Sequence, residues 1–100
     1  MKDIMQLLPE IIGTGEENAT DTETLKVITG LSERELRKCI EQLRRSGCVI
    51  ISASEGGYYK PATSEELSRF IHKEQARACS VLFTLKSAKK LLREWEAGLL

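Results

Sequence analysis

Apolar residues recur at helical spacing near the start of the chain. The first such segment, residues 3–8, predicts a short helix. Pro9 disfavours helical geometry in the residue before it, so we expect this helix to end at Leu8. The pattern leaves open whether Ile11 and Ile12 extend the helix beyond a proline kink.

A second helical pattern follows after a break. Residues 13–19 contain two glycines and an asparagine and predict a loop. The next segment, residues 22–29, predicts a helix that Gly30 ends, as a glycine just beyond a helix commonly does. We expect the apolar positions of this helix to face a core: Leu25, Val27 and Ile28.

The third helix has a clear start signal. Ser32 followed by Glu35 forms the pattern of a capping box, in which each side chain bonds to the backbone of the other residue. The helix is expected to continue to Ser46 and to stop at Gly47. One apolar stripe at helical spacing predicts its buried side: Leu36, Ile40 and Leu43.

A β-hairpin is predicted directly after this helix. The sequence "CVIIS", residues 48–52, is rich in β-branched residues and favours a strand. The sequence "SEGG" predicts a turn, and "YYK", residues 58–60, predicts the returning strand, which ends before Pro61.

From Ser64 the helical pattern continues without a break to Gly98. Apolar residues follow an alternating spacing of four and three residues, which is typical of a coiled-coil seam. The helix is too long to bury this seam on its own small domain, so we expect it to pair with a copy of itself. The seam consists of Leu67, Ile71, Glu74, Ala78, Val81, Leu85, Ala88, Leu92, Trp95 and Leu99, of which only Glu74 is polar.

Charge is balanced over the chain but unevenly distributed. Fifteen basic and fifteen acidic residues cancel, so no overall field would draw the molecule to nucleic acid. Residues 1–30 carry two bases against six acids, residues 31–60 six bases against four acids, and residues 61–100 seven bases against five acids. Any contact with nucleic acid must therefore rest on the middle or the end of the chain.

Other chemical classes are disfavoured. The three cysteines, Cys39, Cys48 and Cys79, have no CxxC spacing, and His72 is the single histidine. This composition argues against a disulfide scaffold and a zinc site and favours buried or half-buried thiols in a reducing cytoplasm. We expect no enzyme activity and no cofactor, because the chain has no recognisable catalytic or phosphate-binding motif. No segment has the length and apolarity of a membrane span or a signal peptide, and we expect no membrane partner.

The order of these elements resembles the winged helix-turn-helix family of DNA-binding domains. The resemblance rests on "ITGLSERELRKCIEQLRRSGCVI" followed by the hairpin "GGYYKP", and it covers roughly residues 1–62. It implies a mainly α (α+β) fold in which the hairpin is the wing, with residues 63–100 as a long dimerisation helix. The long charged helix also makes the chain similar to small phage- or prophage-encoded winged-helix proteins of Gram-positive bacteria.

In this family the third helix would be the recognition helix that lies in a DNA groove. Counted from Leu36 at about 100° per residue, a basic face lies on the opposite side. The groove-reading candidates are Arg34, Arg37, Lys38 and Glu41, and the candidates for phosphate contact are Ser32, Arg44 and Arg45. The alternative interpretation is an ordinary solvated helix face with charge pairs along it.

The predicted wing departs from the family pattern at its tip. Residues 52–57 contain no Lys or Arg, and Glu55 would repel phosphates. The wing therefore either makes little contact with DNA or contacts it through Ser52, Ser54 and Lys60.

These features predict a homodimer that binds double-stranded DNA, as a transcriptional regulator or a replication-associated protein of a mobile element. The alternative hypothesis is a protein-interaction module in which the winged domain is a scaffold and the long helix docks another protein. Residues 86–93, a basic amphipathic stretch, are most simply the solvated outer face of the dimer helix, and membrane or calmodulin-like binding is the alternative interpretation.

Overall fold

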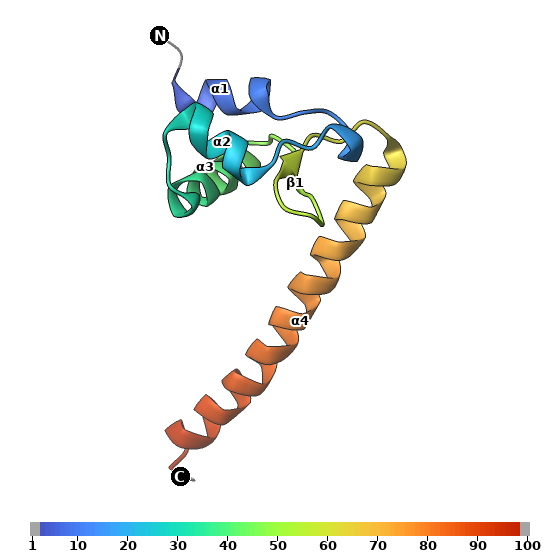
Figure 1. The fold of residues 1–100 in the computed structure, drawn as a ribbon. Helices are drawn as coiled ribbons and strands as arrows, with labels where there is room; N and C mark the ends of the chain where they lie inside the picture. The colour runs from blue at the N-terminus through green and yellow to red at the C-terminus, as the bar shows by residue number, and fades with distance from the viewer. Residues whose placement is uncertain (1–2, 99–100) are drawn as a thin grey trace. The chain divides into compact units, whose positions relative to one another are not determined.

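The computed structural model describes residues 3–98 and is mainly helical, with one β-hairpin and a long C-terminal helix (Figure 1). This coarse architecture confirms the arrangement that the sequence predicts. In chain order the elements are α1 (Ile4–Ile11), η1 (Glu16–Asn18), α2 (Thr22–Thr29), α3 (Glu33–Arg45), β1 (Ile51–Ser52), β2 (Tyr58–Tyr59) and α4 (Ser64–Glu96).

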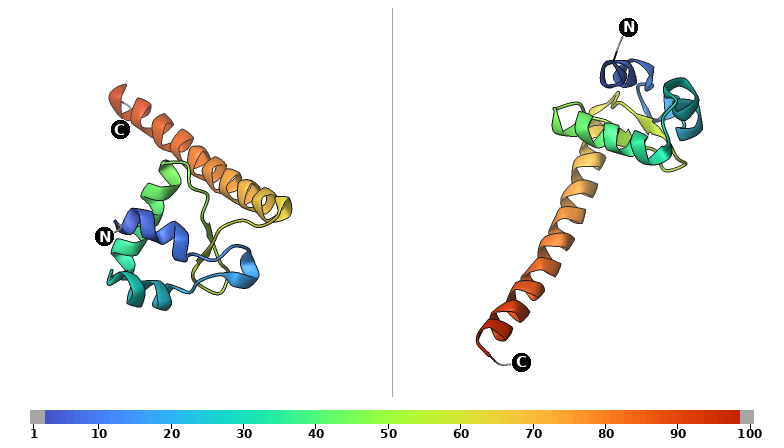
Figure 2. Two further views of the ribbon diagram at one scale, coloured as in Figure 1. Left: turned by 90° about the horizontal axis from the view of Figure 1, so that it is seen from above. Right: turned by 90° about the vertical axis from the view of Figure 1, so that its left-hand side faces the viewer.

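Contacts divide the chain into two units. The first extends to Leu67 and holds the first turn of α4, and the second begins at Ser68. Figures 1 and 2 show α1, α2 and α3 grouped together in the first unit. The core of this unit lies between these helices and the hairpin and consists of Leu8, Ile12, Leu25, Leu36, Ile40, Leu43 and Ile50.

Helix α1 does not end at Leu8 but continues through Pro9 to Ile11. Leu8 and Ile12 are both fully buried, so packing on each side of the proline outweighs its local preference. The amide of Ile12 donates to the carbonyl oxygen of Leu8 at 3.0 Å, which completes the last turn. Of the two residues that the sequence leaves open, Ile11 therefore belongs to the helix, whereas Ile12 is its C-terminal cap in an extended conformation.

Helices α2 and α3 begin and end on the local signals that the sequence carries. Asp21 caps α2 by accepting from the amide of Thr24 at 2.8 Å, and Gly30 ends that helix in the left-handed region at φ 73°. The capping box of α3 is confirmed, because the amide of Ser32 donates to Glu35 and the amide of Glu35 donates to the Ser32 hydroxyl. Only residues 30–32 separate the two helices.

One prediction about α2 is wrong. Leu25 is buried as expected, but Val27 is 82% exposed and Ile28 is 50% exposed. A helix of two turns has a single inward direction, and Val27 lies about 200° around the axis from Leu25. Two apolar side chains of α2 are therefore open to solvent.

The hairpin is shorter than its sequence suggests. Strands β1 and β2 pair antiparallel over only two residues each, with Ile51 opposite Tyr59 and Ser52 opposite Tyr58. Residues 48–50 connect α3 to β1 instead of extending the strand. The amide of Cys48 is used at the end of α3, where it donates to the carbonyl oxygen of Leu43 at 2.9 Å.

The segment that the sequence predicts as a loop, residues 13–19, borders the other edge of β2 together with Thr20. Tyr58 and Thr20 exchange backbone hydrogen bonds of 3.0 and 2.9 Å, and the amide of Gly15 donates to the carbonyl oxygen of Lys60 at 2.7 Å. These isolated bridges extend the hairpin by a third backbone segment. The chain passes so closely here that a Cβ at Gly57 would collide with the carbonyl oxygen of Thr20.

Helix α4 begins where the sequence predicts. Thr63 accepts from the amide of Glu66 at 3.1 Å, and the carboxylate of Glu66 accepts from the amides of Ala62 and Glu16, each at 2.8 Å. These bonds fasten the first turn of α4 and the η1 turn together within the first unit. Leu99, the last residue of the predicted seam, lies outside the described residues.

Candidate nucleic-acid interface

Helix α3 separates its apolar and charged side chains as the sequence predicts. Leu36, Ile40 and Leu43 are buried in the core. The charged candidates, by contrast, are all exposed to solvent: Arg34, Arg37, Lys38, Glu41, Arg44 and Arg45. The outward side of the helix is therefore available to a partner of opposite charge.

Two of these bases are paired with acids of the same helix. The guanidinium of Arg37 lies 3.1 Å from the carboxylate of Glu33, and that of Arg45 lies 2.9 Å from Glu41. Both pairs are at i,i+4 spacing and well exposed, so each contributes little to stability and exchanges easily for another anion. Glu33 is not among the charged residues that the sequence singles out, and its carboxylate reduces the positive charge next to Arg37.

Arg34 and Lys38 differ from these two. Within residues 3–98, neither side chain has a hydrogen-bond or salt-bridge partner. They are four residues apart and so lie next to each other on the helix surface. These two side chains form what we call the cationic pair of α3, the part of the face with unpaired positive charge.

The N-terminus of α3 is already occupied by its own cap. The amide of Ser32 donates to Glu35 at 3.1 Å, and this bond is the main reason why the pKa of Glu35 lies below its usual value. Attraction to Lys38 is the smallest of the contributions. The hydroxyl of Ser32 accepts from the amide of Glu35, so its part in phosphate contact is limited to donating its own hydrogen.

Arg44 joins α3 to the hairpin. Its Nε donates to the carbonyl oxygen of Ile50 at 2.8 Å, and its terminal nitrogen donates to the Ser52 hydroxyl at 3.2 Å. The structure thus brings together one predicted phosphate contact and one predicted wing residue. These bonds hold Arg44 at the junction of helix and hairpin.

Lys60, the one base among the predicted wing contacts, is directed elsewhere. It is half-buried, and its ammonium donates to the carbonyl oxygen of Pro9 in α1 at 2.6 Å. Ser54 and Glu55 lie exposed in the turn between β1 and β2. The turn therefore carries a single ionisable side chain, and that one is acidic.

The cysteines follow the prediction only in part. Cys39 and Cys48 are half-buried, but Cys79 is exposed on α4, which corrects the expectation for all three. Burial, with smaller effects of Glu35 and Asp3, raises the pKa of the Cys39 thiol. Cys79 lies in the part of α4 that belongs to the second unit, and no residue of that helix is buried.

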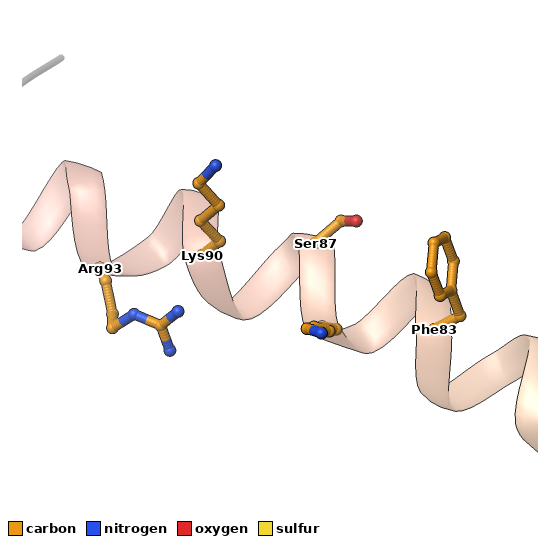
Figure 3. Close-up of a pocket in the computed structure, with 5 residues that line it drawn as sticks. Phe83, Ser87, Lys90 and Arg93 are labelled. Carbon is orange, nitrogen blue, oxygen red and sulfur yellow. The ribbon is translucent and has the colours of Figure 1, made fainter.

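The predicted pairing positions of α4 are open to solvent. Leu85, Leu92 and Trp95 are 45%, 54% and 57% exposed. Away from this seam, Phe83 is 73% exposed, which the heptad pattern alone does not indicate. It borders a shallow hollow of about 250 Å³ on the same helix, which is also lined by Lys86, Ser87, Lys90 and Arg93 (Figure 3).

Two other kinds of site, a metal cluster and a membrane-spanning helix, are absent from residues 3–98. No group of three or more His, Cys, Asp or Glu side chains lies close enough together to hold a metal ion in this part of the chain. Nor does any helix among these residues have the length and apolarity needed to span a membrane.

Comparison with known proteins finds no family model, curated protein or solved structure that matches the chain. The function must therefore be argued from the geometry and charge of the chain itself.

Proposed function

We propose that this chain is a winged helix-turn-helix protein that binds double-stranded DNA as a homodimer. The observation that supports this most is the cationic pair, Arg34 and Lys38, on a helix whose other side is locked into the core. A helix held in this way can enter a major groove without disturbing its own packing.

The order of the elements supports the same proposal. Helix α3 follows α2 after three residues that include Gly30, which is the spacing of a helix-turn-helix. The hairpin follows α3 directly and is tied to it through Arg44 and Ile50. In a winged domain this hairpin is the wing, and here its acidic tip leaves DNA contact mainly to α3.

The charged side chains then have distinct roles. Arg34 and Lys38 bind phosphates or guanine edges directly, because no acid has to be displaced first. Arg37 and Arg45 exchange Glu33 and Glu41 for phosphates, at a low cost because exposed salt bridges contribute at most about 1 kcal/mol. Glu41, once released, can accept a hydrogen bond from a cytosine amino group.

A dimer makes this modest charge sufficient. The chain has no net charge, so a single α3 face neutralises few phosphates. Pairing through the exposed seam of α4 brings two such faces to one DNA molecule and covers the apolar side chains of the helix. The biological role that we attach to this activity, control of transcription or replication in a mobile element, rests on the family resemblance.

Fluorescence anisotropy with a random duplex of about 30 base pairs, measured over a series of salt concentrations, tests the proposal. The double variant Arg34→Ala/Lys38→Ala should lose at least tenfold in affinity at low salt. The slope of log affinity against log salt should also become shallower, since each lost phosphate contact removes about 0.9 from it.

The matched control removes the same charge from α4. Arg69→Ala/Lys73→Ala changes two exposed bases outside the proposed interface and should bind within about twofold of the unchanged chain. Equal losses in both variants would mean that only total charge matters, and the recognition role of α3 would be rejected.

A second candidate function is a protein-interaction module. The exposed apolar side chains of Val27 and Ile28 on α2 favour it, because neither has a role in the DNA proposal. The absence of binding to any duplex at low salt, together with a monomeric chain in light scattering, would favour this second candidate.

A further inference from the structure

Helix α4 carries a seam that a single chain leaves uncovered. None of its residues is buried, and the second unit consists of this helix alone within the described residues. Helices in proteins gain most of their stability by packing an apolar face against a partner. The four–three spacing is sustained from Leu67 to Trp95, which is enough for a coiled coil. The open question is the direction in which a second copy lies.

The seam contains two alternating kinds of position. In heptad notation the a positions are Ile71, Ala78, Leu85 and Leu92, and the d positions are Leu67, Glu74, Val81, Ala88 and Trp95. In a parallel pair in register, each seam residue faces its own copy. In an antiparallel pair, each a position faces a d position of the other chain, because the two chains run in opposite directions.

Glu74 distinguishes the two arrangements. A parallel pair places its carboxylate directly against the same carboxylate of the second copy, inside an otherwise apolar seam. Like charges in such a place repel and favour the other arrangement. An antiparallel pair places Glu74 opposite an a position, all of which are apolar between Ile71 and Leu92. Arg77 lies 3.8 Å from Glu74 on the same helix, and this salt bridge is available in the parallel and in the antiparallel pair alike.

The charges along α4 point the same way. Residues 86–96 carry four bases and two acids, residues 65–77 carry three of each, and residues 78–85 carry none. A parallel pair brings two basic ends together, whereas an antiparallel pair lays each basic end beside a balanced half. In register, a parallel pair also gains no ion pair between its flanking g and e positions, which are Phe70–Gln75, Arg77–Leu82, Thr84–Lys89 and Leu91–Glu96.

We infer that α4 pairs with α4 of a second copy in antiparallel orientation. The uncharged centre, residues 78–85, crosses its own copy, and the two basic ends lie apart. The 33 residues of α4 make a rod of about 50 Å, and a DNA-binding unit is attached at each end of the pair. This inference rests on the homodimer of the proposed function and adds the orientation of its partner.

Distances between spin labels test the orientation. The background is the full chain with Cys39→Ala, Cys48→Ala and Cys79→Ser, checked for helix content by circular dichroism. Into it we place either His72→Cys or Arg93→Cys, which are exposed, lie on the same flank of α4 and are 21 residues apart. Each labelled dimer then gives one distance between the two copies, measured by electron–electron double resonance.

An antiparallel pair fixes the sum of the two distances in every register whose crossing point lies between the two labelled positions. At a rise of about 1.5 Å per residue, the distances for the two positions should add up to roughly 60 Å, because a shift that shortens one lengthens the other. A parallel pair in register would give a short distance at both positions, since each label faces its own copy.

The outcomes separate this inference from the proposed function. Two short distances in a dimeric chain would overturn the orientation and leave the homodimer standing. A monomer in sedimentation at the concentration of the labelling experiment would overturn both the homodimer and the orientation. A sum near 60 Å in a chain that binds no duplex would support the orientation and reject the DNA proposal alone.

Discussion

Arg44 donates from Nε to the carbonyl oxygen of Ile50 at 2.8 Å, across the point where α3 gives way to the hairpin. The same guanidinium reaches the Ser52 hydroxyl at 3.2 Å. Because the planar guanidinium of Arg44 bonds both to the segment that connects α3 with β1 and to β1 itself, the hairpin has a defined direction relative to α3. A residue expected to contact phosphate is thus also a structural fastening.

This fastening makes Arg44→Ala a destabilising change. Its loss leaves the carbonyl oxygen of Ile50 without this donor, at a cost of about 1 to 2 kcal/mol in the free energy of unfolding. Urea denaturation measures the difference. Arg45→Ala is the control, because Arg45 makes only an exposed salt bridge with Glu41 and should change stability by at most about 0.5 kcal/mol. Equal losses would show that the bonds of Arg44 carry no particular weight.

Glu33→Gln should strengthen DNA binding. The substitution removes the acid that pairs with Arg37 at 3.1 Å and raises the positive charge of the α3 face. We expect a gain of about threefold to tenfold in affinity for a random duplex at low salt, which disappears as salt rises. Glu65→Gln, in the first turn of α4, removes the same charge from another helix start and should have no such effect. A weaker complex with the Glu33 variant would contradict the proposed orientation of α3 towards DNA.

The capping box gives the stability of the fold a pH dependence. The pKa values of Glu35 and Asp21 both lie below their ordinary values of 4.5 and 3.8, in each case because of hydrogen bonds at a helix start. A carboxyl group whose pKa is lowered by folding stabilises the fold at pH values above its ordinary pKa. This contribution is lost as the pH falls through the folded-state pKa. Glu35→Gln should therefore be less stable than the unchanged chain at pH 7, and this difference should shrink as the pH falls below 4.5 and through the lower folded-state pKa of Glu35. Thermal melts of both proteins at pH 7 and over a series of lower pH values measure the difference in stability. A difference that stays the same at every pH would contradict the role of the Glu35 carboxylate.

Gly57 and Gly56 provide a matched pair at the hairpin turn. Both have φ 98°, but a Cβ at Gly56 meets nothing within 4 Å, whereas one at Gly57 collides with Thr20. Each substitution by alanine carries backbone strain of about 1 to 3 kcal/mol, and only Gly57→Ala adds the collision. We expect Gly57→Ala to be clearly the less stable variant in urea denaturation. Similar stabilities of the two variants would mean that the backbone around Thr20 moves away from the new methyl group at little cost.

Leu85→Arg should convert the proposed dimer into a monomer. The substitution places a charge in the seam of α4, where a partner helix would have to bury it. Sedimentation velocity measures the mass. Ala76→Arg places the same side chain on the opposite side of the helix and should leave the dimer intact. A dimeric Leu85→Arg chain would locate the pairing surface elsewhere.

Much of the first unit could be predicted because its signals are local. The bounds of α2, the capping box at Ser32 and the buried stripe of α3 each depend on residues within about two turns of one another. The exposed face of α3 followed from the same periodicity. The start of α4 at Ser64 was equally clear, and Thr63 caps it by accepting from the amide of Glu66.

What the sequence by itself determined is therefore which residues form α2 and α3, where α4 begins and which side of α3 faces outwards, because capping and periodicity act within one helix. Only the tertiary structure decided the partners that lie far apart in the chain. Lys60 binds the carbonyl oxygen of Pro9, 51 residues away, and Tyr58 pairs with Thr20, while Val27 remains outside the core. Such contacts depend on how separate elements pack, and no local pattern in the sequence encodes that packing.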